Sequence, residues 1–346
     1  FAIDEHELSN LYTTSAKVFS SSGLMEVLRL DTVDLGDIEH FGFHDGISQP
    51  VVEGMNQSDT AMNTIKAGEF LLGYRNEYGL YTDRPLLKPA LDAKGLLPCD
   101  SSGSGNADFG RNGSYLVFRQ LRQDVRGFWQ FLDEATKNAD GSSNVDARIK
   151  LAAQMVGRWP GGAPLVQSPD TDEPTLAGAN DFVYYKTDPY GYNCPLGAHV
   201  RRAHPRDSLD PQPGSEQSLA IDKRHRILRR GREYGPPVDP NELLTVKKTL
   251  AEDEDRGLHF LCVNANIARQ FEFIQHTWIN NPHFNGLYDD ADPLLGVHCA
   301  DGSTFTMQAQ PVRKRVTHLP RFVTVAGGAY FFMPGVKALC YLASLS

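Results

Sequence analysis

The order of strand-like and helix-like segments constrains the fold of this chain most. Residues 68–74 and 114–121 are rich in aromatic and aliphatic side chains, a composition that predicts strands. Helices are predicted over 126–138 and over 145–159. In the second helix, apolar residues recur at helical spacing after Asn144, a candidate N-cap: Val145, Ile149, Ala152, Val156 and Trp159. Strands and helices are thus interspersed from the start of the chain.

The remainder of the chain continues this mixture. The predicted elements are strands at 226–234 and 257–265, a helix with an apolar stripe (Ile267, Phe271, Ile274, Trp278), a hairpin of 322–326 with 330–333, and a helix at 336–345. Because a parallel α/β sheet needs a strict alternation of strand and helix, this order predicts an α+β fold with antiparallel sheets. Residues 160–190 are dense in Pro, Gly, Asp and Thr, so we interpret them as the crossing between two halves, 1–160 and 161–346.

Composition argues against several classes of protein. The 346 residues carry a formal net charge of −9, whereas nucleic-acid binders neutralise phosphates with Lys and Arg. The basic residues of 223–232 are a local exception, which indicates either a solvated face or an anionic ligand inside the protein. No apolar run approaches the roughly 18 residues of a membrane-spanning helix. The five cysteines are an odd number without paired spacing, so neither a disulfide framework nor a zinc site is expected.

The run from Gly42 to Pro50 holds an acid between two glycines. Gly42 and Gly46 permit a sharp turn and a close approach of the backbone to a flat or bulky ligand, and Pro50 argues against a long helix or a central strand. Asp45, held in such a loop, is a candidate general acid or base. The alternative is an Asx-type turn, in which the carboxylate only accepts local backbone N–H groups. This segment alone leaves both interpretations open.

Three further segments carry residues suited to chemistry. Residues 194–206 combine two histidines with three arginines, although a single histidine is more often a satisfied core residue than a ligand. Residues 226–231 place charge on alternate faces of a strand, so one arginine is expected to point inward. Residues 257–261 form an apolar strand suited to the wall of a pocket. With Asp45 these segments supply an acid, a guanidinium, a histidine and aromatic walls, which is the inventory of a haem peroxidase.

Four motifs occur in order and at suitable spacings: Gly42-x-x-Asp45-Gly46, Cys-Pro-Leu-Gly-Ala-His199-Val-Arg, Ile-Leu-Arg229-Arg-Gly and Gln270-Phe-Glu-Phe-Ile-Gln275. With them, residues 40–346 resemble the dye-decolorizing peroxidases, and 327–334 are similar to that family's C-terminal hairpin. The resemblance implies two ferredoxin-like halves with antiparallel sheets, the Asp45 loop in the first half and haem b in the second. The family usually has a longer region before the acid motif, so the first half is expected to be incomplete at its N-terminus.

The resemblance also implies roles for single residues. By position, His199 matches the proximal ligand of the haem iron, and Asp45 matches the distal acid–base group with Arg229 as its cationic partner. The implied cofactor-binding residues, which wall the pocket or pair with a haem propionate, are Ile47, Leu258, Phe260 and Arg206. His204 is interpreted as non-ligating.

Three more residues are implied around this centre. A ligating histidine usually donates its second N–H to an acceptor, for which Asp292 is the candidate and Asn266 the alternative. Tyr234 and Trp278 fall where the family places surface aromatics that carry electrons from bulky dyes. Both also have structural interpretations, since Trp278 fits the apolar stripe of its helix and Tyr234 ends a predicted strand.

The implied function is a peroxidase that reduces hydrogen peroxide and oxidises bulky dyes and phenolic compounds. An acidic optimum is expected, because a carboxylate with a pKa near ~4 still acts as a base where a histidine near ~6.5 is protonated. The expected partners are hydrogen peroxide and an organic reductant, with no nucleic acid and no membrane span. The alternatives are a haem-handling protein with vestigial peroxidase activity and a non-haem metal hydrolase that uses His40 and His44. The oligomeric state and the localisation stay open, with the cytoplasm slightly favoured over secretion.

Overall fold

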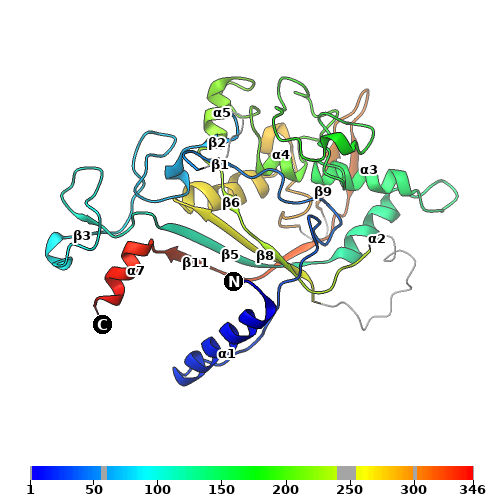
Figure 1. Cartoon of the computed structure of the whole chain (residues 1–346). Helices are drawn as coiled ribbons and strands as arrows, with labels where there is room; N and C mark the ends of the chain where they lie inside the picture. Colours follow the sequence, from blue (N-terminus) through cyan, green and yellow to red (C-terminus); the bar gives the residue numbers. More distant parts are fainter. Residues whose placement is uncertain (1, 56–60, 240–254, 299–301, 346) are drawn as a thin grey trace. The chain divides into compact units, whose positions relative to one another are not determined.

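The structure is a computed structural model that describes residues 2–55, 61–239, 255–298 and 302–345 (Figure 1). The chain divides into two compact units, one up to Thr32 and one from Val33 onward. Among the described residues, no helix is both long enough and apolar enough to cross a membrane.

The first unit contains helix α1 (Glu5–Ser21). The helix begins after Asp4, whose carboxylate accepts a hydrogen bond of 2.8 Å from the N–H of Glu7. This side chain satisfies one of the N–H groups that a helix start leaves without an internal partner.

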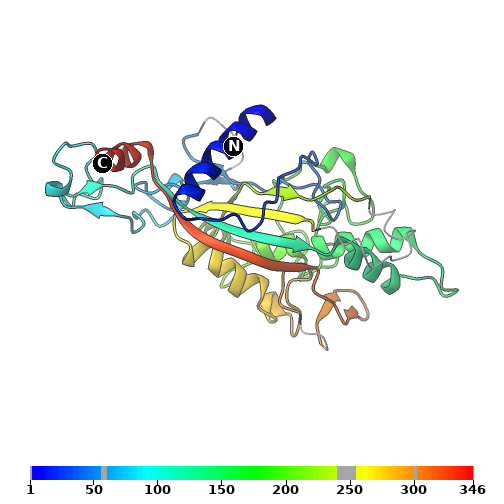
Figure 2. The same cartoon turned by 90° about the horizontal axis from the view of Figure 1, so that it is seen from below.

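The second unit is built around an antiparallel sheet of five strands: β5 (Ser114–Gln123), β6 (Leu228–Arg229), β7 (Arg232–Tyr234), β8 (Gly257–Asn264) and β11 (Val323–Met333). Their order is β11-β5-β8-β6, and β7 also pairs with β8. The long strands β5, β8 and β11 lie side by side in Figures 1 and 2. Every pairing in this sheet is antiparallel, which confirms the α+β prediction. Strand β5 comes before residue 160 in the sequence, whereas its neighbours β8 and β11 come after residue 160. The predicted boundary between two halves at residue 160 stays a prediction.

The register of the sheet decides which side chains share a face. Residues that lie directly opposite in antiparallel strands point to the same side, and Arg229 lies opposite Cys262 of β8. Since alternate residues of a strand share a face, Leu258 and Phe260 lie on the same face as Arg229. Tyr234 lies opposite Gly257 and therefore on the other face.

Helices α2 (Val125–Ala135) and α3 (Val145–Val156) confirm the two helices predicted before residue 160. The side chain of Asn144 caps α3 by accepting from the N–H of Ala147 at 3.0 Å, as predicted. The helix ends at Gly157, whose φ of +100° lies in the left-handed region that favours glycine. These helices help to form the largest core cluster of the molecule, which also includes two aromatic side chains of the Asp45 loop, Phe41 and Phe43.

Two π-helical segments, η4 (Ala268–Glu272) and η5 (Ile274–Ile279), run along one face of the sheet (Figure 2). Their wide winding shows in the backbone bond from the N–H of Glu272 to the carbonyl of Ile267, five residues earlier. The predicted apolar stripe of this helix is buried at Phe271, Ile274 and Trp278.

Three predicted elements differ from the structure. Residues 68–74 form the 3₁₀-helix η1 (Ala67–Glu69) and turns rather than a strand. The chain folds back on itself here, so that a Cβ at Gly68 would lie 2.3 Å from the carbonyl carbon of Arg75. The segment 226–234 is broken into β6 and β7. The predicted hairpin around Gly327 is a single strand, β11, with a bulge between Val325 and Gly327. A glycine in a strand often marks a bulge instead of a turn.

The remaining elements are short. They are β1 (Val51–Val52) paired in parallel with β2 (Thr64–Ile65), β3 (Leu86–Leu87) with β4 (Ala107–Asp108), β9 (Thr304–Met307) with β10 (Lys314–Thr317), the 3₁₀-helices η2 (Pro89–Leu91), η3 (Pro174–Leu176) and η6 (Phe284–Gly286), and the helices α4 (His199–Ala203), α5 (Glu216–Lys223) and α7 (Val336–Ala343). The four described cysteines are free thiols, and Cys299 lies outside the described residues.

Candidate active site

The loop of residues 37–48 presents Asp45 on a backbone fixed from both sides. Gly42 has a φ of +92° and Gly46 a φ of +80°, so both glycines adopt the left-handed conformation that a sharp turn requires. The N–H of Asp45 donates to the carbonyl of Asp37 at 2.9 Å. The N–H of His44 donates to the carbonyl of Pro160, also at 2.9 Å. The backbone bonds leave the Asp45 side chain available to distant partners.

The partner of Asp45 is Arg229. Nη1 of Arg229 lies 2.9 Å from Oδ1 of Asp45, and the side chains are 32% and 39% exposed. Burial alone would raise the pKa of Asp45, but the charge of Arg229 and hydrogen bonds to the carboxylate outweigh it and lower that pKa. The carboxylate is therefore held in its ionised form by a residue far away in the sequence, and is not confined to an Asx-type turn.

Two residues that the sequence did not single out tie this loop to β6. The side-chain oxygen of Gln49 accepts from the N–H of Arg229 at 3.1 Å. The buried guanidinium of Arg226 donates to the carbonyl of Ser48 at 3.0 Å. Arg226 belongs to the basic segment 223–232, whose charge indicated either a solvated face or an anionic ligand inside the protein; Arg226 is buried and so is not part of a solvated face, and an anionic ligand stays a prediction.

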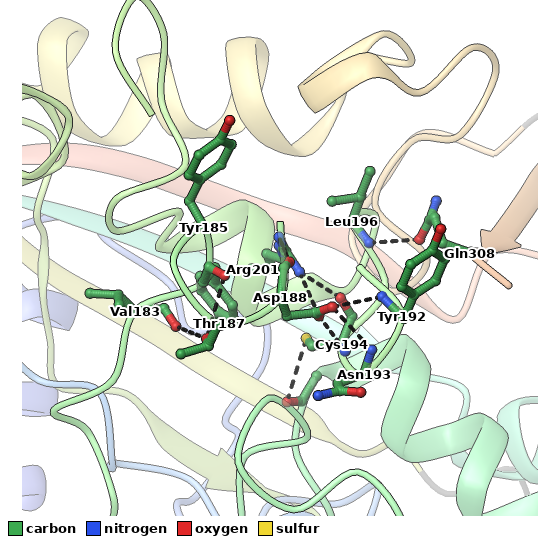
Figure 3. Close-up of polar contacts among 12 residues, drawn as sticks. Val183, Tyr185, Thr187, Asp188, Tyr192, Asn193, Cys194, Leu196, Arg201 and Gln308 are labelled. Carbon is green, nitrogen blue, oxygen red and sulfur yellow. Dashed lines mark hydrogen bonds and ion pairs between the residues drawn. The ribbon is translucent and has the colours of Figure 1, made fainter. Parts of the chain in front are cut away.

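On the other side of the site, an ion pair fixes the loop before α4 (Figure 3). The buried carboxylate of Asp188 accepts hydrogen bonds from three backbone N–H groups, those of Tyr192, Asn193 and Cys194. The guanidinium of Arg201, in α4, pairs with Asp188 at 3.1 Å and is itself buried. This network sets the path of the chain into α4 and so places His199 at its first turn.

A second guanidinium, that of Arg202, anchors α4 to backbone carbonyls that follow in the sequence. The buried side chain of Arg202 donates to the backbone carbonyls of Trp278 at 2.8 Å and of Asn281 at 3.0 Å, and also to that of Asp290. These bonds join α4 to η5 and to the segment that follows it.

His199 has a buried carboxylate behind it. Its Nδ1 lies 2.9 Å from Oδ2 of Asp292, and the other oxygen of Asp292 accepts from the N–H groups of Leu294 and Leu295. Burial would lower the pKa of His199, but the charge of Asp292 and its hydrogen bond outweigh that effect and raise it. With Nδ1 engaged, Nε2 is the nitrogen left for a ligand. The structure brings His199 and Asp292 together as the sequence predicted, and the alternative acceptor Asn266 instead bonds the N–H of Arg269.

The charges of Asp45 and His199 also act on each other, as smaller contributions beside those of Arg229 and Asp292. Such an interaction requires that the two side chains lie within electrostatic reach. The carboxylate–guanidinium pair therefore lies within electrostatic reach of an imidazole that a second carboxylate holds in place.

Comparisons with known proteins point to one family, although no family model matches the chain. A dye-decolorizing peroxidase of Mycena epipterygia is 34% identical over 340 residues, which cover 88% of this chain and 57% of the relative. The multifunctional dye peroxidase DyP2 of an Amycolatopsis species is 33% identical over 319 residues, 89% of this chain and 61% of the relative. The chain thus spans less than two thirds of the length of these curated relatives.

Solved structures agree with these relatives. The structure of an ancestral D-type dye decolorizing peroxidase is 30% identical with a TM-score of 0.72, and the similarity covers 97% of this chain and 71% of that one. A crystal structure of a triple mutant of the peroxidase from Auricularia auricula-judae reaches a TM-score of 0.75 at 27% identity, covering 98% and 72%. The chain belongs to the dye-decolorizing peroxidase family.

The residues of this chain fit the haem that the motifs imply. An imidazole whose Nδ1 donates to a carboxylate leaves Nε2 oriented for an iron. One buried donor nearby in the sequence, Nε of Arg206, has no hydrogen-bond partner among the described residues, and a guanidinium suits a carboxylate. The terminal nitrogens of Arg206 bond Asn180 and the carbonyl of Phe182, so the pairing with a haem propionate stays a prediction that rests on Nε.

The predicted walls of the pocket lie on suitable elements. Leu258 and Phe260 are half-buried on the face of β8 that they share with Arg229. Ile47 is half-buried in the Asp45 loop and packs tightly on Gly162, where a Cβ would lie 3.0 Å from its Cδ1. Their contact with a cofactor stays a prediction.

Neither predicted surface aromatic lies on the surface. Tyr234 is 0% exposed, and its hydroxyl donates to the carbonyl of Leu121 at 3.2 Å. Its register places it on the face of the sheet away from Arg229. Trp278 is 4% exposed and packs against Phe273 and His225. The surface placement was wrong because Trp278 lies in an apolar cluster and the ring of Tyr234 packs against His259 inside the fold; an electron-carrying role for either stays a prediction.

Two further predictions concern histidines away from His199: that His204 is not a ligand, and that His40 and His44 form the metal site of a hydrolase. His204 is buried and lies 3.0 Å from Asp222, and burial lowers its pKa to about 3, so it is neutral. His40, proposed with His44 as a ligand pair of a hydrolase, bonds the carbonyl of Tyr234 through Nε2 at 2.8 Å. In the part of the chain that the structure describes, no group of three or more His, Cys, Asp or Glu side chains is arranged to hold a metal ion.

Proposed function

We propose that this protein is a peroxidase that binds haem b, reduces hydrogen peroxide and oxidises dyes and phenolic compounds. The observation that carries this proposal is the ion pair of Asp45 and Arg229 within electrostatic reach of His199, whose imidazole is held by Asp292. Membership of the dye-decolorizing peroxidase family supports it. Haem, when bound, supplies an iron for His199 and a store for the oxidising equivalents of the peroxide.

Asp45 acts as the acid–base group in this proposal. Its carboxylate accepts a proton from one oxygen of hydrogen peroxide and returns it to the other oxygen, which leaves as water. Arg229 donates hydrogen bonds toward the negative charge that develops as the O–O bond breaks. Both side chains are held by the loop and the strand before peroxide arrives, so little reorganisation is needed.

A reconstitution experiment tests the function. Titration of the protein with haem is expected to give one equivalent of bound haem with a Soret band, and rapid mixing with hydrogen peroxide is expected to change that band within milliseconds to seconds. Oxidation of an anthraquinone dye should then require peroxide. Haem binding without reaction with peroxide would favour a haem-handling protein, and absence of haem binding would contradict both.

The pH dependence of the peroxide reaction is expected to depend on Arg229. Ionised Asp45 is the active base, so the rate constant falls as pH drops through its lowered pKa. In Arg229→Gln the attraction that opposes burial is gone, so the pKa rises and the acid limb of the profile moves to higher pH. Rate constants measured by rapid mixing between pH 3 and 7 check this. The exposed Arg232 on β7 provides the control Arg232→Gln, whose pH profile should have the same acid limb as the wild type. An acid limb at the wild-type pH in Arg229→Gln would count against the ion pair.

The electron-carrying role predicted for Trp278 has a test of its own. Trp278→Phe is expected to lower turnover of bulky dyes several-fold and to spare small phenols that reach the pocket, because phenylalanine is harder to oxidise. Steady-state rates on an anthraquinone dye and on a simple phenol compare the two. Phe273→Leu disturbs the same packing, since the rings of Phe273 and Trp278 lie 5.5 Å apart, without changing the oxidisable residue. If both variants lose both activities equally, the role of Trp278 is structural.

A further inference from the structure

Glu39 lies six residues before Asp45 and binds the turn between them. Its Oε2 accepts from the N–H of Phe41 at 3.0 Å and its Oε1 from the N–H of Phe43 at 3.1 Å. The side-chain amide of Gln123, at the end of β5, donates to Oε2 at 2.8 Å. One carboxylate thus satisfies two backbone groups of the turn and fastens the turn to the central sheet.

The backbone of Glu39 is paired with the same turn. Its N–H donates to the carbonyl of Phe43 at 3.0 Å, and its carbonyl accepts from Gly42 at 2.8 Å. Two residues on in this ladder, the N–H of Asp45 bonds the carbonyl of Asp37. A shift of the turn at 41–43 is therefore passed directly to the backbone that carries Asp45.

The surroundings of Glu39 contain few compensating charges. It lines a cavity of about 550 Å³ whose other charged or titratable side chains are Asp34, His40 and Arg148. Arg148 pairs with Asp133 rather than with Glu39. Burial and, to a smaller extent, the negative charge of Asp45 raise the pKa of Glu39 to about 7, against the effect of the three hydrogen bonds. Glu39 therefore changes its charge near neutral pH, within the electrostatic reach of Asp45.

Gln123 is suited to both protonation states of Glu39. Its Nε2 donates to the carboxylate, while its Oε1 is buried without a hydrogen-bond partner in the described structure. A rotation of the amide by half a turn would present Oε1 to the O–H of a protonated Glu39. The pair then keeps a hydrogen bond whichever state Glu39 adopts.

We propose that Glu39 is a positioning residue for Asp45: it holds the 41–43 turn through its carboxylate and acts by charge on the carboxylate of Asp45. The ionised form makes charge-assisted bonds to the turn, which are stronger than those of the neutral acid. Its charge also makes Asp45 a stronger base. When Glu39 is neutral, its bonds to the turn are weaker and its effect on the basicity of Asp45 is absent. The proposal rests on the proposed peroxidase function, because positioning is measured through the reaction of Asp45 with peroxide.

The test compares wild type and Glu39→Gln, which has nearly the same shape and stays neutral at every pH. Rate constants of the haem-loaded proteins with hydrogen peroxide are measured from pH 5 to 9. The ratio of wild type to variant is expected to rise about tenfold as pH passes through 7, since only the wild type gains a charge there. A ratio that stays flat with a reactive wild type would overturn the proposal. A wild type that binds haem and does not react with peroxide would overturn the proposed function as well.

A second readout needs no reaction. The pKa of Glu39 is raised above its value in the unfolded chain, so ionisation of Glu39 opposes folding, and the stability that the neutral form contributes is lost as pH rises from about 4 to 7. In urea titrations of the apoprotein, the midpoint of wild type relative to Glu39→Gln should therefore be higher at pH 5 than at pH 8. An equal difference at both pH values would show that Glu39 does not titrate in this range and would contradict the proposal.

Glu69→Gln is the matched control. Glu69 is a buried carboxylate whose pKa is likewise raised by burial, but it pairs with Arg269 at 2.6 Å, and its hydrogen-bond partners lie outside the Asp45 loop. Its loss is expected to lower stability and to leave the ratio of peroxide rate constants independent of pH. A pH-dependent ratio in this variant as well would show that the effect is not specific to Glu39, and would also contradict the proposal.

Discussion

Asp45→Asn is expected to slow the reaction with hydrogen peroxide by about 10²–10⁴-fold, the usual contribution of a positioned acid–base group. Asparagine keeps the size of the side chain and a hydrogen-bond acceptor for Arg229, but it cannot take up the proton of the peroxide. The measurement is the second-order rate constant from rapid mixing of the haem-loaded protein with peroxide. Haem content should remain that of the wild type, since Asp45 is not expected to ligate the iron.

The control for this substitution is Asp37→Asn. Asp37 lies in the same loop with an exposed side chain, and the loop uses its backbone carbonyl, which the substitution leaves in place. Its rate constant should stay within about twofold of the wild type. A loss as large as that of Asp45→Asn would mean that the loop, and not the carboxylate of Asp45, limits the reaction.

His199→Ala is expected to have the second large effect, loss of the protein ligand to the haem iron. Without an imidazole at this position, bound haem should fall strongly, and any that remains should show an altered Soret band. Imidazole added to the solution is expected to restore part of the wild-type spectrum, since it can occupy the space of the missing ring. The measurement is a haem titration followed by absorbance, with His276→Ala, an exposed histidine of η5, as the control.

A graded variant separates the ligand from its support. Asp292→Asn removes the charge behind His199 but keeps an acceptor near Nδ1, and loss of such a partner commonly costs about 10–100-fold in affinity or activity. Haem affinity should therefore lie between those of the wild type and His199→Ala. An affinity equal to that of the wild type would show that the hydrogen bond at 2.9 Å does not tune the ligand.

Two residue pairs that the sequence proposed for the site meet in the structure, although several elements around them differ from the prediction. Motif order pointed to Asp45 with Arg229, and the need of a ligating histidine for an acceptor pointed to Asp292 beside His199; the roles of these residues stay predictions. Periodicity cannot supply such pairs, because Asp45 and Arg229 are 184 positions apart and meet only through the tertiary fold.

The failures have physical causes of the same kind. Tyr234 was placed by sequence position alone, but a side chain one residue along a strand points to the opposite face, and only the register with Gly257 decides which. Adjacent glycines at 327 and 328 suggested a turn, yet the pairing of β11 with β5 continues through them with a bulge. No individual role was predicted for Gln49, Arg226 or Glu39, because their roles depend on backbone groups of distant or folded-back segments, for which a single sequence carries no signal.

The bonds of Arg202 indicate which residues around α4 must be kept for the helix to stay in place. The helix that carries His199 is tied to main-chain carbonyls of residues 278, 281 and 290, and every amino acid supplies a carbonyl. The bonds that hold the helix therefore do not depend on which side chains stand at those three positions. They do depend on the side chain of Arg202 itself, because a lysine ammonium is a single point charge and cannot reach three carbonyls that a branched, planar guanidinium spans.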